Sequence, residues 1–504
     1  MERMRGTDRT MRSRILWSII ILAACALRVF QLTFFEFKND QLAAIALGHQ
    51  ARAAGFMVTH GMPSGVGVNN PPLFVWLMGS ATAVTNDPLI LTALVTLLNV
   101  VALGLAFRYF SRSLPAGQAR VTAALLAVTP AGVFYSNILW AQCLLPPLMI
   151  LFHIAFHRLI TKGRPSAFVW MVLLATLASQ LHLSGAVLFP ILGIVTLRFR
   201  RMLRPAPLVI SALLAALLSS PYLYHLFAEG ELRRFVTGVR RAAGTPLWSM
   251  LLEQMRMSSI DFLRCYFRED FTEILRRAAG PAWFVAYGLS CALGAFWAAA
   301  LLVYLFRAIR ARALLDDSSE ARAACPLPVQ IAGFMTLAVT LGYLVLRVRT
   351  PPHYFIVLFP SYALLAGWAA HRVWQSAERF AGHRGAGFLV LLPLLATALL
   401  LFAVLLFLRR SGGHPAEYGP HYAQLLEWKA DLWRQVPPGC APSLTISRPR
   451  AGKFDTEAVG WILLDARSEP EKGTIPMTLT VNWDAFAMRY GTTLIRSPAD
   501  RGLP

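Results

Sequence analysis

The chain alternates between long apolar stretches and short polar segments. A helix needs ~20 apolar residues to cross a bilayer, and most of the stretches reach or approach that length. They cover approximately residues 15–35, 88–110, 120–136, 138–157, 168–197, 207–227, 282–306, 328–346, 353–371 and 388–408. Because 168–197 is long enough for a pair of short helices, the pattern predicts an all-α polytopic membrane protein with about eleven transmembrane helices.

Short basic clusters separate these stretches at alternate loops. They lie at residues 3–14, 108–120, 158–164, 198–204, 307–322 and 372–384. Positively charged loops favour the cytoplasmic side of a membrane, which predicts a cytoplasmic N-terminus. The formal net charge of +22 therefore belongs to membrane-flanking loops, and its distribution argues against nucleic-acid binding.

The stretch Phe168–Leu197 has thirty residues and a basic cluster at each end. Two full membrane crossings need roughly forty residues, so we expect a short or re-entrant hairpin with Ser179–His182 at its tip. Polar backbone at such a depth is tolerated only against protein or a water-filled cavity. The hairpin therefore predicts a cavity that opens to the outer side.

Two outer segments interrupt the apolar pattern. The first outer loop, residues 36–86, contains a helical stretch at Gln41–Ala54 and an apolar piece at Leu73–Val84. The second, residues 228–280, contains an amphipathic run at Leu247–Phe267, which we expect to lie along the membrane surface.

After residue 410 the apolar runs become short. We predict a transmembrane domain at residues 1–410 and a small extracytoplasmic α+β domain at residues 411–504. The second domain has the pattern of one amphipathic helix, Tyr422–Val436, and of three strands at Leu444–Ser447, Val459–Asp465 and Met477–Trp483.

Composition excludes several classes of protein. Apolar residues make up 56% of the chain, too many for an ordinary soluble enzyme. The six cysteines form no CxxC pair, so no metal-binding or redox motif is visible. No glycine-rich phosphate-binding loop is present either, and we expect neither a cofactor nor a metal.

Polar residues gather at the ends of the spans that this topology places outside. Arg28 also lies within the outer half of the first span, where an ionisable residue indicates function. No comparable set lies at the inner ends, so we expect the active site on the outer face. The polar residues are Asn39, Asp40, His60, Asn69, Asn70, Asn137, Gln142, Gln180, His182, Arg347, Arg349, His353 and Tyr354.

These residue types suit sugar transfer from a lipid phosphate. The Asp40 carboxylate can take the proton of an acceptor hydroxyl as that hydroxyl attacks the anomeric carbon. The leaving lipid phosphate needs fixed cations and hydrogen-bond donors, which we assign to Arg28, Arg347, Arg349, His353 and Tyr354. Substrate binding falls to the amides and to the two other histidines, Asn39, His60, Asn69, Asn70, Asn137, Gln142, Gln180 and His182.

Each of these residues also has a structural interpretation. Asp40 has a residue type that caps helices, and Asn69–Pro72 has the composition of a turn. Arg28 can extend towards the membrane surface, and Arg347 with Arg349 can anchor to headgroups. Gln180 and His182 can satisfy the polar groups of a hairpin tip, and His60 can be an ordinary loop histidine.

Five motifs carry a resemblance to a known family. They are Asn39-Asp40-Gln41, Pro71-Pro72-Leu73-Phe74, Ser136-Asn137-Ile138-Leu139-Trp140, Gln180-Leu181-His182 and His353-Tyr354-Phe355 with the following run to Pro360. Over roughly residues 15–410 the chain resembles the bacterial dolichyl-phosphate-mannose-protein-mannosyltransferase-like superfamily of the glycosyltransferase family 39 type. Those GT-C enzymes include the lipid A aminoarabinose transferases. The resemblance implies an inverting, metal-independent hexosyl or pentosyl transfer from a polyprenyl-phosphate sugar.

The chain departs from the family pattern at three places. Gln41 follows Asp40 where a glutamate is common, and Asn69-Asn70 stands where Glu-Lys is common. His353 replaces an arginine, which shifts phosphate binding towards Arg347, Arg349 or Arg28. The departures weaken any transfer of aminoarabinose specificity to this chain.

The favoured function is therefore glycosyl transfer at the outer face of a bacterial inner membrane. Its partners are a polyprenyl-phosphate-linked sugar donor and an envelope lipid, glycan or protein acceptor. A transporter or flippase for a lipid-linked saccharide is the alternative, although such proteins commonly show related halves, which this sequence lacks. A catalytically inactive scaffold with the same fold is the third possibility.

Overall fold

The computed structural model describes residues 2–64, 67–234, 237, 244–311, 315, 324–347, 350–414, 418–436, 441–447, 459, 462–464, 474–484 and 489–496. Most of these residues are helical, and the strands are confined to residues after 412. The helices of the N-terminal half are α1 (Glu2–Gln31), α2 (Asn39–Ala53), α3 (Leu73–Thr82), α4 (Pro88–Ser113), α5 (Ala116–Val128), α6 (Pro130–Phe134), α7 (Leu145–Lys162), α8 (Pro165–Leu181), α9 (Leu188–Phe199) and α10 (Pro205–Ala228), with the 3₁₀ turns η1 (Tyr135–Asn137), η2 (Ala141–Leu144) and η3 (Leu183–Val187).

The second half has fewer long helices. They are α12 (Leu247–Arg256), α13 (Arg264–Phe267), α14 (Phe271–Ala279), α15 (Trp283–Ala311), α17 (Leu327–Leu346), α18 (Ser361–Ser411) and α19 (Tyr422–Arg434), with the 3₁₀ turns η4 (Ile260–Leu263), η5 (Arg268–Asp270), η6 (Gly280–Ala282) and η7 (Pro352–Leu358). The strands are β1 (Gly413–His414), β2 (Gly419–Pro420), β3 (Ala441–Ser447), β4 (Thr474–Asp484) and β5 (Arg489–Arg496).

The chain is a multi-pass membrane protein, as the apolar pattern predicts. Within the described ranges, seven helices are long and apolar enough to cross a membrane, and two bent pairs raise the number to nine. The bends measure 57° between α5 and α6 and 72° between η7 and α18. The segments Pro165–Leu181 and Leu183–Phe199 are shorter apolar helices, so every predicted membrane stretch is largely helical.

Proline and capping residues explain where many helices begin and end. Proline occupies the first turn of α4, α7, α8, α10 and α17, where its missing N–H costs no hydrogen bond. The Asp87 carboxylate accepts the Leu89 N–H at 2.8 Å and caps α4. Gly163 ends α7 with a φ of +56°, a conformation that glycine adopts without strain.

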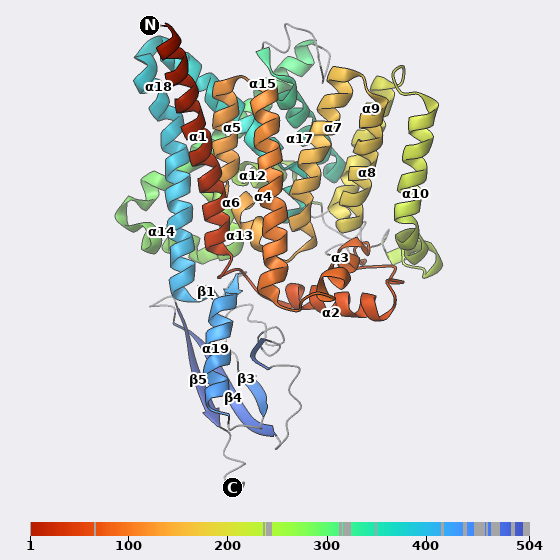
Figure 1. The fold of residues 1–504 in the computed structure, drawn as a ribbon, viewed down its shortest axis with the longest axis vertical. Helices are drawn as coiled ribbons and strands as arrows, with labels where there is room; N and C mark the ends of the chain where they lie inside the picture. The colour runs from red at the N-terminus through yellow and green to blue at the C-terminus, as the bar shows by residue number, and fades with distance from the viewer. Residues whose placement is uncertain are drawn as a thin grey trace. The chain divides into compact units, whose positions relative to one another are not determined.

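The chain forms two compact units. The first comprises Met1–Arg28, Ala44–Phe262 and Val285–Leu399. Figure 1 shows α4, α5, α7, α8 and α10 of this unit side by side, with α3 below them. Many large side chains on these helices are exposed, for example Leu213 (65%) and Leu217 (70%) on α10. Such exposed apolar surface is expected where a helix contacts lipid.

The second unit comprises Val29–Ala43, Leu263–Phe284 and Leu400–Pro504. Strands β3 and β4 pair in parallel, β4 and β5 pair antiparallel, and β1 pairs with β2. The loop after α1 packs on the segment before α19. The Tyr418 hydroxyl donates to the Phe34 carbonyl at 2.6 Å, and the Tyr422 N–H donates to the Phe35 carbonyl at 3.0 Å. The division of the chain at residue 410 stays a prediction.

The amphipathic run Leu247–Phe267 forms three helical pieces, α12, η4 and α13, and the Ser259 hydroxyl accepts the Asp261 N–H where the chain turns between them. Two local predictions are wrong. Val459, Ile462 and Leu463 are helical and not part of a strand, and their apolar spacing fits a helix. The basic segment 372–384 lies within α18 instead of forming a loop, because no proline interrupts it.

Candidate functional site

The tip of the hairpin between α8 and η3 presents an ordered histidine. His182 is 3% exposed, and its Nδ1 accepts the Ser184 N–H at 3.2 Å and lies 2.8 Å from the Ser184 hydroxyl. A neutral imidazole that accepts at Nδ1 carries its proton on Nε2. The hairpin therefore holds His182 as a hydrogen-bond donor through Nε2.

The first outer loop is fastened to this hairpin by Asn70. The Asn70 amide oxygen accepts the Leu183 N–H at 3.2 Å, while its nitrogen donates to the Met62 carbonyl at the same distance. The carbonyl of Asn69 accepts the hydroxyl of Tyr222 on α10 at 2.8 Å. The Asn-Asn pair thus connects the loop to the α8–η3 hairpin and to α10, which is more than a turn requires.

A third element brings further predicted residues to the same place. His353 and Tyr354 lie in η7, and their rings are 6.2 Å and 5.4 Å from the ring of His182. Trp140, after η1, lies 5.7 Å from His353. The Tyr343 hydroxyl donates to the carbonyls of Ser184 and Tyr354, both at 3.2 Å, and so fixes η7 against the hairpin. We call His182, His353, Tyr354 and Trp140 the tip cluster.

The other predicted amides contribute differently. Gln180 is 5% exposed and donates to the Ser219 hydroxyl at 3.4 Å. Asn137 is fully buried, and its amide oxygen accepts the Thr96 hydroxyl at 3.0 Å. Gln142 lies in η2 and is half-buried. Asn137 therefore joins helices internally, whereas Gln180 remains a candidate for substrate binding.

Arg28 is fully buried near the end of α1 and does not extend to the membrane surface. Its Nε donates to the Ser136 hydroxyl at 3.1 Å, and its Nη1 donates to the carbonyls of Ala24 and Ala127 at 2.9 and 3.0 Å. Pro130 has no N–H, and α5 bends there, which frees carbonyl groups at the end of that helix. Arg28 satisfies one of them, and phosphate binding by its Nη2 stays a prediction.

Of the two arginines predicted to bind phosphate after α17, the structure describes one. Arg347 is exposed and adopts a left-handed conformation with a φ of +50°, which ends α17. An exposed guanidinium at the end of a membrane helix suits either a phosphate or a headgroup. Arg349 lies outside the described residues.

Asp40 and Asn39 are exposed residues at the start of α2, in the second unit. The Gln41 side-chain oxygen accepts the Lys38 N–H at 2.8 Å, the arrangement of a capping box. Gln41 thus caps the helix, and the Asp40 carboxylate adds a favourable negative charge to the first turn. The catalytic role of Asp40 stays a prediction.

A buried carboxylate lies shortly before Asp40 in the sequence. Glu36 is 1% exposed and forms an ion pair with Lys38 at 2.7 Å. Its backbone also pairs with that of His421. Glu36 is therefore part of the interior of the second unit.

His60 lies in a group of three potential metal ligands. Its ring stacks on that of His225 at 4.4 Å, and the His225 Nδ1 lies 2.6 Å from a Glu229 oxygen. Burial and the neighbouring His225 lower the pKa of His60, while the hydrogen bond to His225 lowers the pKa of Glu229. The sequence signal that could have revealed this group is the four-residue spacing between His225, in the last turn of α10, and Glu229, which follows that helix.

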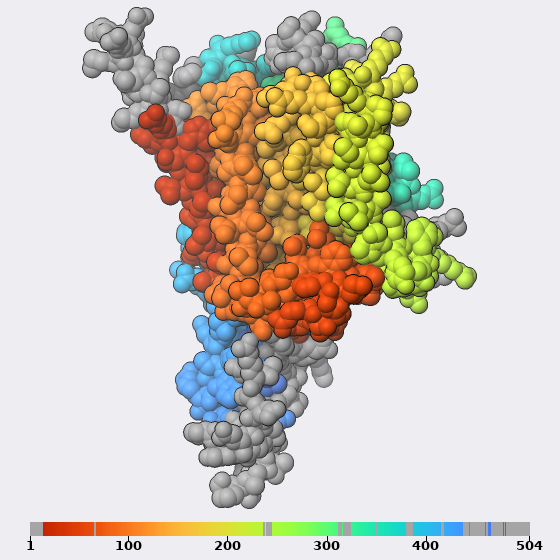
Figure 2. All heavy atoms as spheres, turned by 45° about the vertical axis from the view of Figure 1, so that its right-hand side comes forward, coloured from red at the N-terminus to blue at the C-terminus, as the bar shows by residue number. Residues whose placement is uncertain are grey.

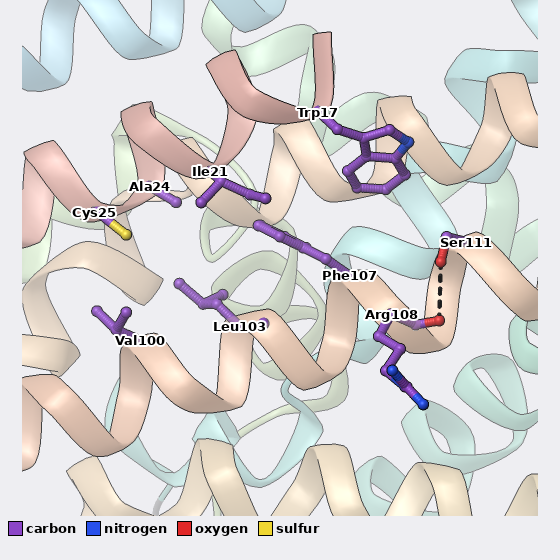
Figure 3. Close-up of a pocket in the computed structure, with 10 residues that line it drawn as sticks. Trp17, Ile21, Ala24, Cys25, Val100, Leu103, Phe107, Arg108 and Ser111 are labelled. Atoms are coloured by element: carbon purple, nitrogen blue, oxygen red, sulfur yellow. Dashed lines mark hydrogen bonds between the residues drawn. The ribbon is translucent and has the colours of Figure 1, made fainter. Parts of the chain in front are cut away.

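A separate groove of 510 Å³ lies between α1 and α4 (Figure 3). Apolar side chains line most of it, including Trp17, Ile21, Leu103 and Phe107, and Arg108 lies at one end. No carboxylate is among its lining residues. The groove suits a hydrocarbon chain and offers no base for a transfer reaction.

Part of the chain matches a known family of membrane proteins. Residues 69–225 match the family described as dolichyl-phosphate-mannose-protein mannosyltransferase. This segment contains Asn69, Asn70, Asn137, Gln180 and His182. No curated protein matches the chain in sequence.

The fold is similar to that of ArnT from Cupriavidus metallidurans over nearly the whole length of both chains. Its crystal structure bound to undecaprenyl phosphate has a TM-score of 0.52 at 12% identity and covers 95% of this chain and 98% of its own. The apo structure has a TM-score of 0.51 at 13% identity and covers 97% and 98%. The similarity confirms the predicted GT-C fold class.

Proposed function

We propose that this chain is an integral-membrane glycosyltransferase that takes a sugar from a polyprenyl-phosphate carrier. The acceptor is an envelope lipid, glycan or protein on the outer face of a bacterial inner membrane. The N-terminus is cytoplasmic and the region after residue 410 is extracytoplasmic in this proposal, following the alternating basic clusters.

One observation carries the proposal. The family match over residues 69–225 includes the segments that supply Asn70 and His182, and the structure joins these two segments through the Asn70–Leu183 hydrogen bond. The match alone would be compatible with an inactive scaffold. The coincidence of the family segment with an ordered polar cluster favours an enzyme. The ArnT fold supports the same class, because a crystal structure of that protein contains undecaprenyl phosphate.

The reaction requires one proton transfer and one exchange of bonds at carbon. Asp40 takes the proton from the acceptor hydroxyl, and the hydroxyl oxygen forms a bond to the anomeric carbon. The bond between that carbon and the carrier phosphate oxygen breaks, and the electron pair leaves with the lipid phosphate. Attack opposite the leaving group inverts the anomeric configuration. No metal is required for this sequence of events.

Three kinds of group meet the needs of the donor. Arg347 supplies a guanidinium that can bind two phosphate oxygens at once. His182 and Tyr354 supply uncharged donors for sugar or phosphate oxygens, and the tip cluster supplies aromatic surface for a sugar ring. Asn70 and Gln180 complete the set of amides for sugar hydroxyl groups.

The decisive test replaces Asp40 with asparagine. Asn keeps the shape of the side chain and leaves the Gln41 cap in place, but it cannot accept a proton. With purified protein in liposomes and a panel of polyprenyl-phosphate sugars, we expect transfer to fall by roughly 10²–10⁴ while thermal stability decreases only slightly, through loss of the first-turn charge. Product is measured by mass spectrometry of the acceptor fraction, and its anomeric configuration by NMR.

The control is a second carboxylate replaced by its amide. Glu36 cannot serve, because it is buried and its replacement would disturb the fold. Asp431 is an exposed carboxylate on α19 that pairs with Arg434. Asp431→Asn should retain full transfer. Near-wild-type transfer by Asp40→Asn would remove Asp40 as the base. Movement of an intact lipid-linked sugar across the bilayer without transfer would favour the flippase.

A further inference from the structure

Three side chains from two segments converge at the end of α10. His60 comes from the first outer loop, His225 from the last turn of α10 and Glu229 from the residue that follows this helix. One ligand atom from each side chain lies within 4.8 Å of the other two. All three belong to the first unit. Figure 2 shows the two segments adjoining at the lower right of the molecule.

The two imidazoles have nitrogen atoms without a hydrogen-bond partner in the part of the chain that is described. They are His60 Nδ1 and His225 Nε2, and both atoms are buried. His225 itself is only 3% exposed. Buried polar atoms are normally satisfied, so two such nitrogens in adjacent rings require an explanation.

The carboxylate beside them is already oriented. One oxygen of Glu229 accepts the Thr59 hydroxyl at 2.9 Å, and the other lies 2.6 Å from His225 Nδ1. A carboxylate that ligates a metal is usually held by a hydrogen bond of its own, and Thr59 holds Glu229 in this way. Two neutral imidazoles and a carboxylate are also the donor types that Zn²⁺ prefers.

We propose that His60, His225 and Glu229 bind a divalent transition metal of the Zn²⁺ class. Tetrahedral zinc sites with bonds of about 2.0–2.2 Å place their ligand atoms about 3.4 Å apart. The three ligand atoms lie within 4.8 Å of one another, and the 2.6 Å contact between His225 Nδ1 and Glu229 has to widen, so an ion fits after side-chain movements of roughly 1 Å. Three protein ligands leave the fourth position for water or another oxygen ligand.

The metal fastens the first outer loop to α10. The same loop is attached to α10 by the Tyr222–Asn69 hydrogen bond, and the ring of Tyr222 lies 5.9 Å from that of His225. Metal binding therefore stabilises the loop segment that carries Asn69 and Asn70. The proposed metal site has a structural role and takes no part in catalysis. Metal binding there does not depend on glycosyl transfer.

Zinc binding can be measured without any sugar donor. Full-length protein is purified in detergent with an affinity tag that contains no histidine, stripped with EDTA and titrated with Zn²⁺ by calorimetry. We expect stoichiometric binding, together with a higher unfolding temperature in zinc than in EDTA. His60→Gln and Glu229→Gln should each weaken binding more than about tenfold, and Thr59→Val should weaken it less.

The control is Glu231→Gln, which removes a nearby carboxylate outside the group of three. It should bind zinc as the wild type does. His60 is half-buried in a loop and Glu229 is 38% exposed, so both variants are expected to fold. Equal zinc affinity in wild type, His60→Gln and Glu229→Gln would overturn the proposal, as would absence of zinc binding by the wild type. Neither result bears on the transfer assay of Asp40.

Discussion

Gly185, in the hairpin that carries His182, is a position where a single methyl group tests the structure. A Cβ atom built on Gly185 would meet the carbonyl carbon of Ala178, and it would lie 2.6 Å from both the Ala178 oxygen and the Ser179 nitrogen. These atoms belong to the backbone of α8, so no change of side-chain rotamer can relieve the clash. Gly185→Ala must therefore separate η3 from α8 or tilt the end of that helix.

The expected loss of stability is large because the added methyl group meets backbone atoms of α8. Overpacking a well-packed interior typically costs about 1–3 kcal/mol, and contact with backbone places this variant towards the upper end. The damage is local to the site, because the Gly185 N–H donates to the His182 carbonyl at 2.8 Å. We expect loss of stability together with weaker use of the donor.

Gly193, on α9, provides the matched control. A Cβ atom there meets no atom within 4 Å, and the residue is exposed. Gly193→Ala should be neutral or stabilising by about 0.5–1 kcal/mol, because alanine loses less conformational freedom in a helix. The difference between the two variants should be about 1–4 kcal/mol.

The assay is reversible unfolding of both variants and wild type in mixed micelles with increasing SDS, followed by circular dichroism. Donor use is measured in parallel in liposomes. Equal unfolding midpoints for Gly185→Ala and Gly193→Ala would show that η3 does not pack on α8 as described. Lost stability with unchanged donor use would instead separate the hairpin tip from the reaction.

Two further predictions concern the second unit and the lipid phosphate. Nδ1 of His421 accepts the Gln424 N–H at 2.9 Å and caps α19, while Nε2 lies 3.3 Å from the Arg409 carbonyl. Burial lowers the pKa of His421 to about 4, so its stabilising contribution is complete above the unfolded pKa of 6.5 and decreases as the pH falls towards 4. The protection factors of the α19 amides, which correct for the intrinsic exchange rate, should fall as the pH is lowered from 7 to 5, and His421→Asn, which caps without titrating, should remove that dependence; unchanged protection factors would contradict the cap. Arg347→Ala should raise the KM for the donor and Arg347→Lys should restore it incompletely, since lysine cannot bind two oxygens as a fork; unchanged kinetics would leave Arg347 as a headgroup anchor.

The membrane fold was predictable because its signal is hydrophobic length. Each predicted stretch from 15–35 to 388–408 is largely helical, and the short hairpin at Phe168–Leu197 follows from the residue count alone. The break in the amphipathic run after α12 was not predictable from periodicity. It depends on a single side-chain hydrogen bond from Ser259, which competes with helix formation.

The candidate site was only partly predictable because its members meet through tertiary contacts. The sequence indicated His182, His353 and Tyr354, and the structure brings their rings together. Nothing in the pattern indicated that Tyr343 joins them, since a tyrosine within an apolar helix has no distinctive signal. The pattern also could not distinguish the internal bonding of Arg28 from phosphate binding, because both require a buried guanidinium.

Asn70 limits how this chain could be converted towards the more common family sequence. Its side chain accepts one backbone hydrogen bond and donates another, which lysine, having no acceptor, cannot reproduce. The substitution Asn70→Lys, made to restore a missing cation, would detach the loop from the hairpin at the same time. An engineer who wanted that cation would have to redesign the Leu183 end of the hairpin together with the loop, so the two segments have to be exchanged as one block.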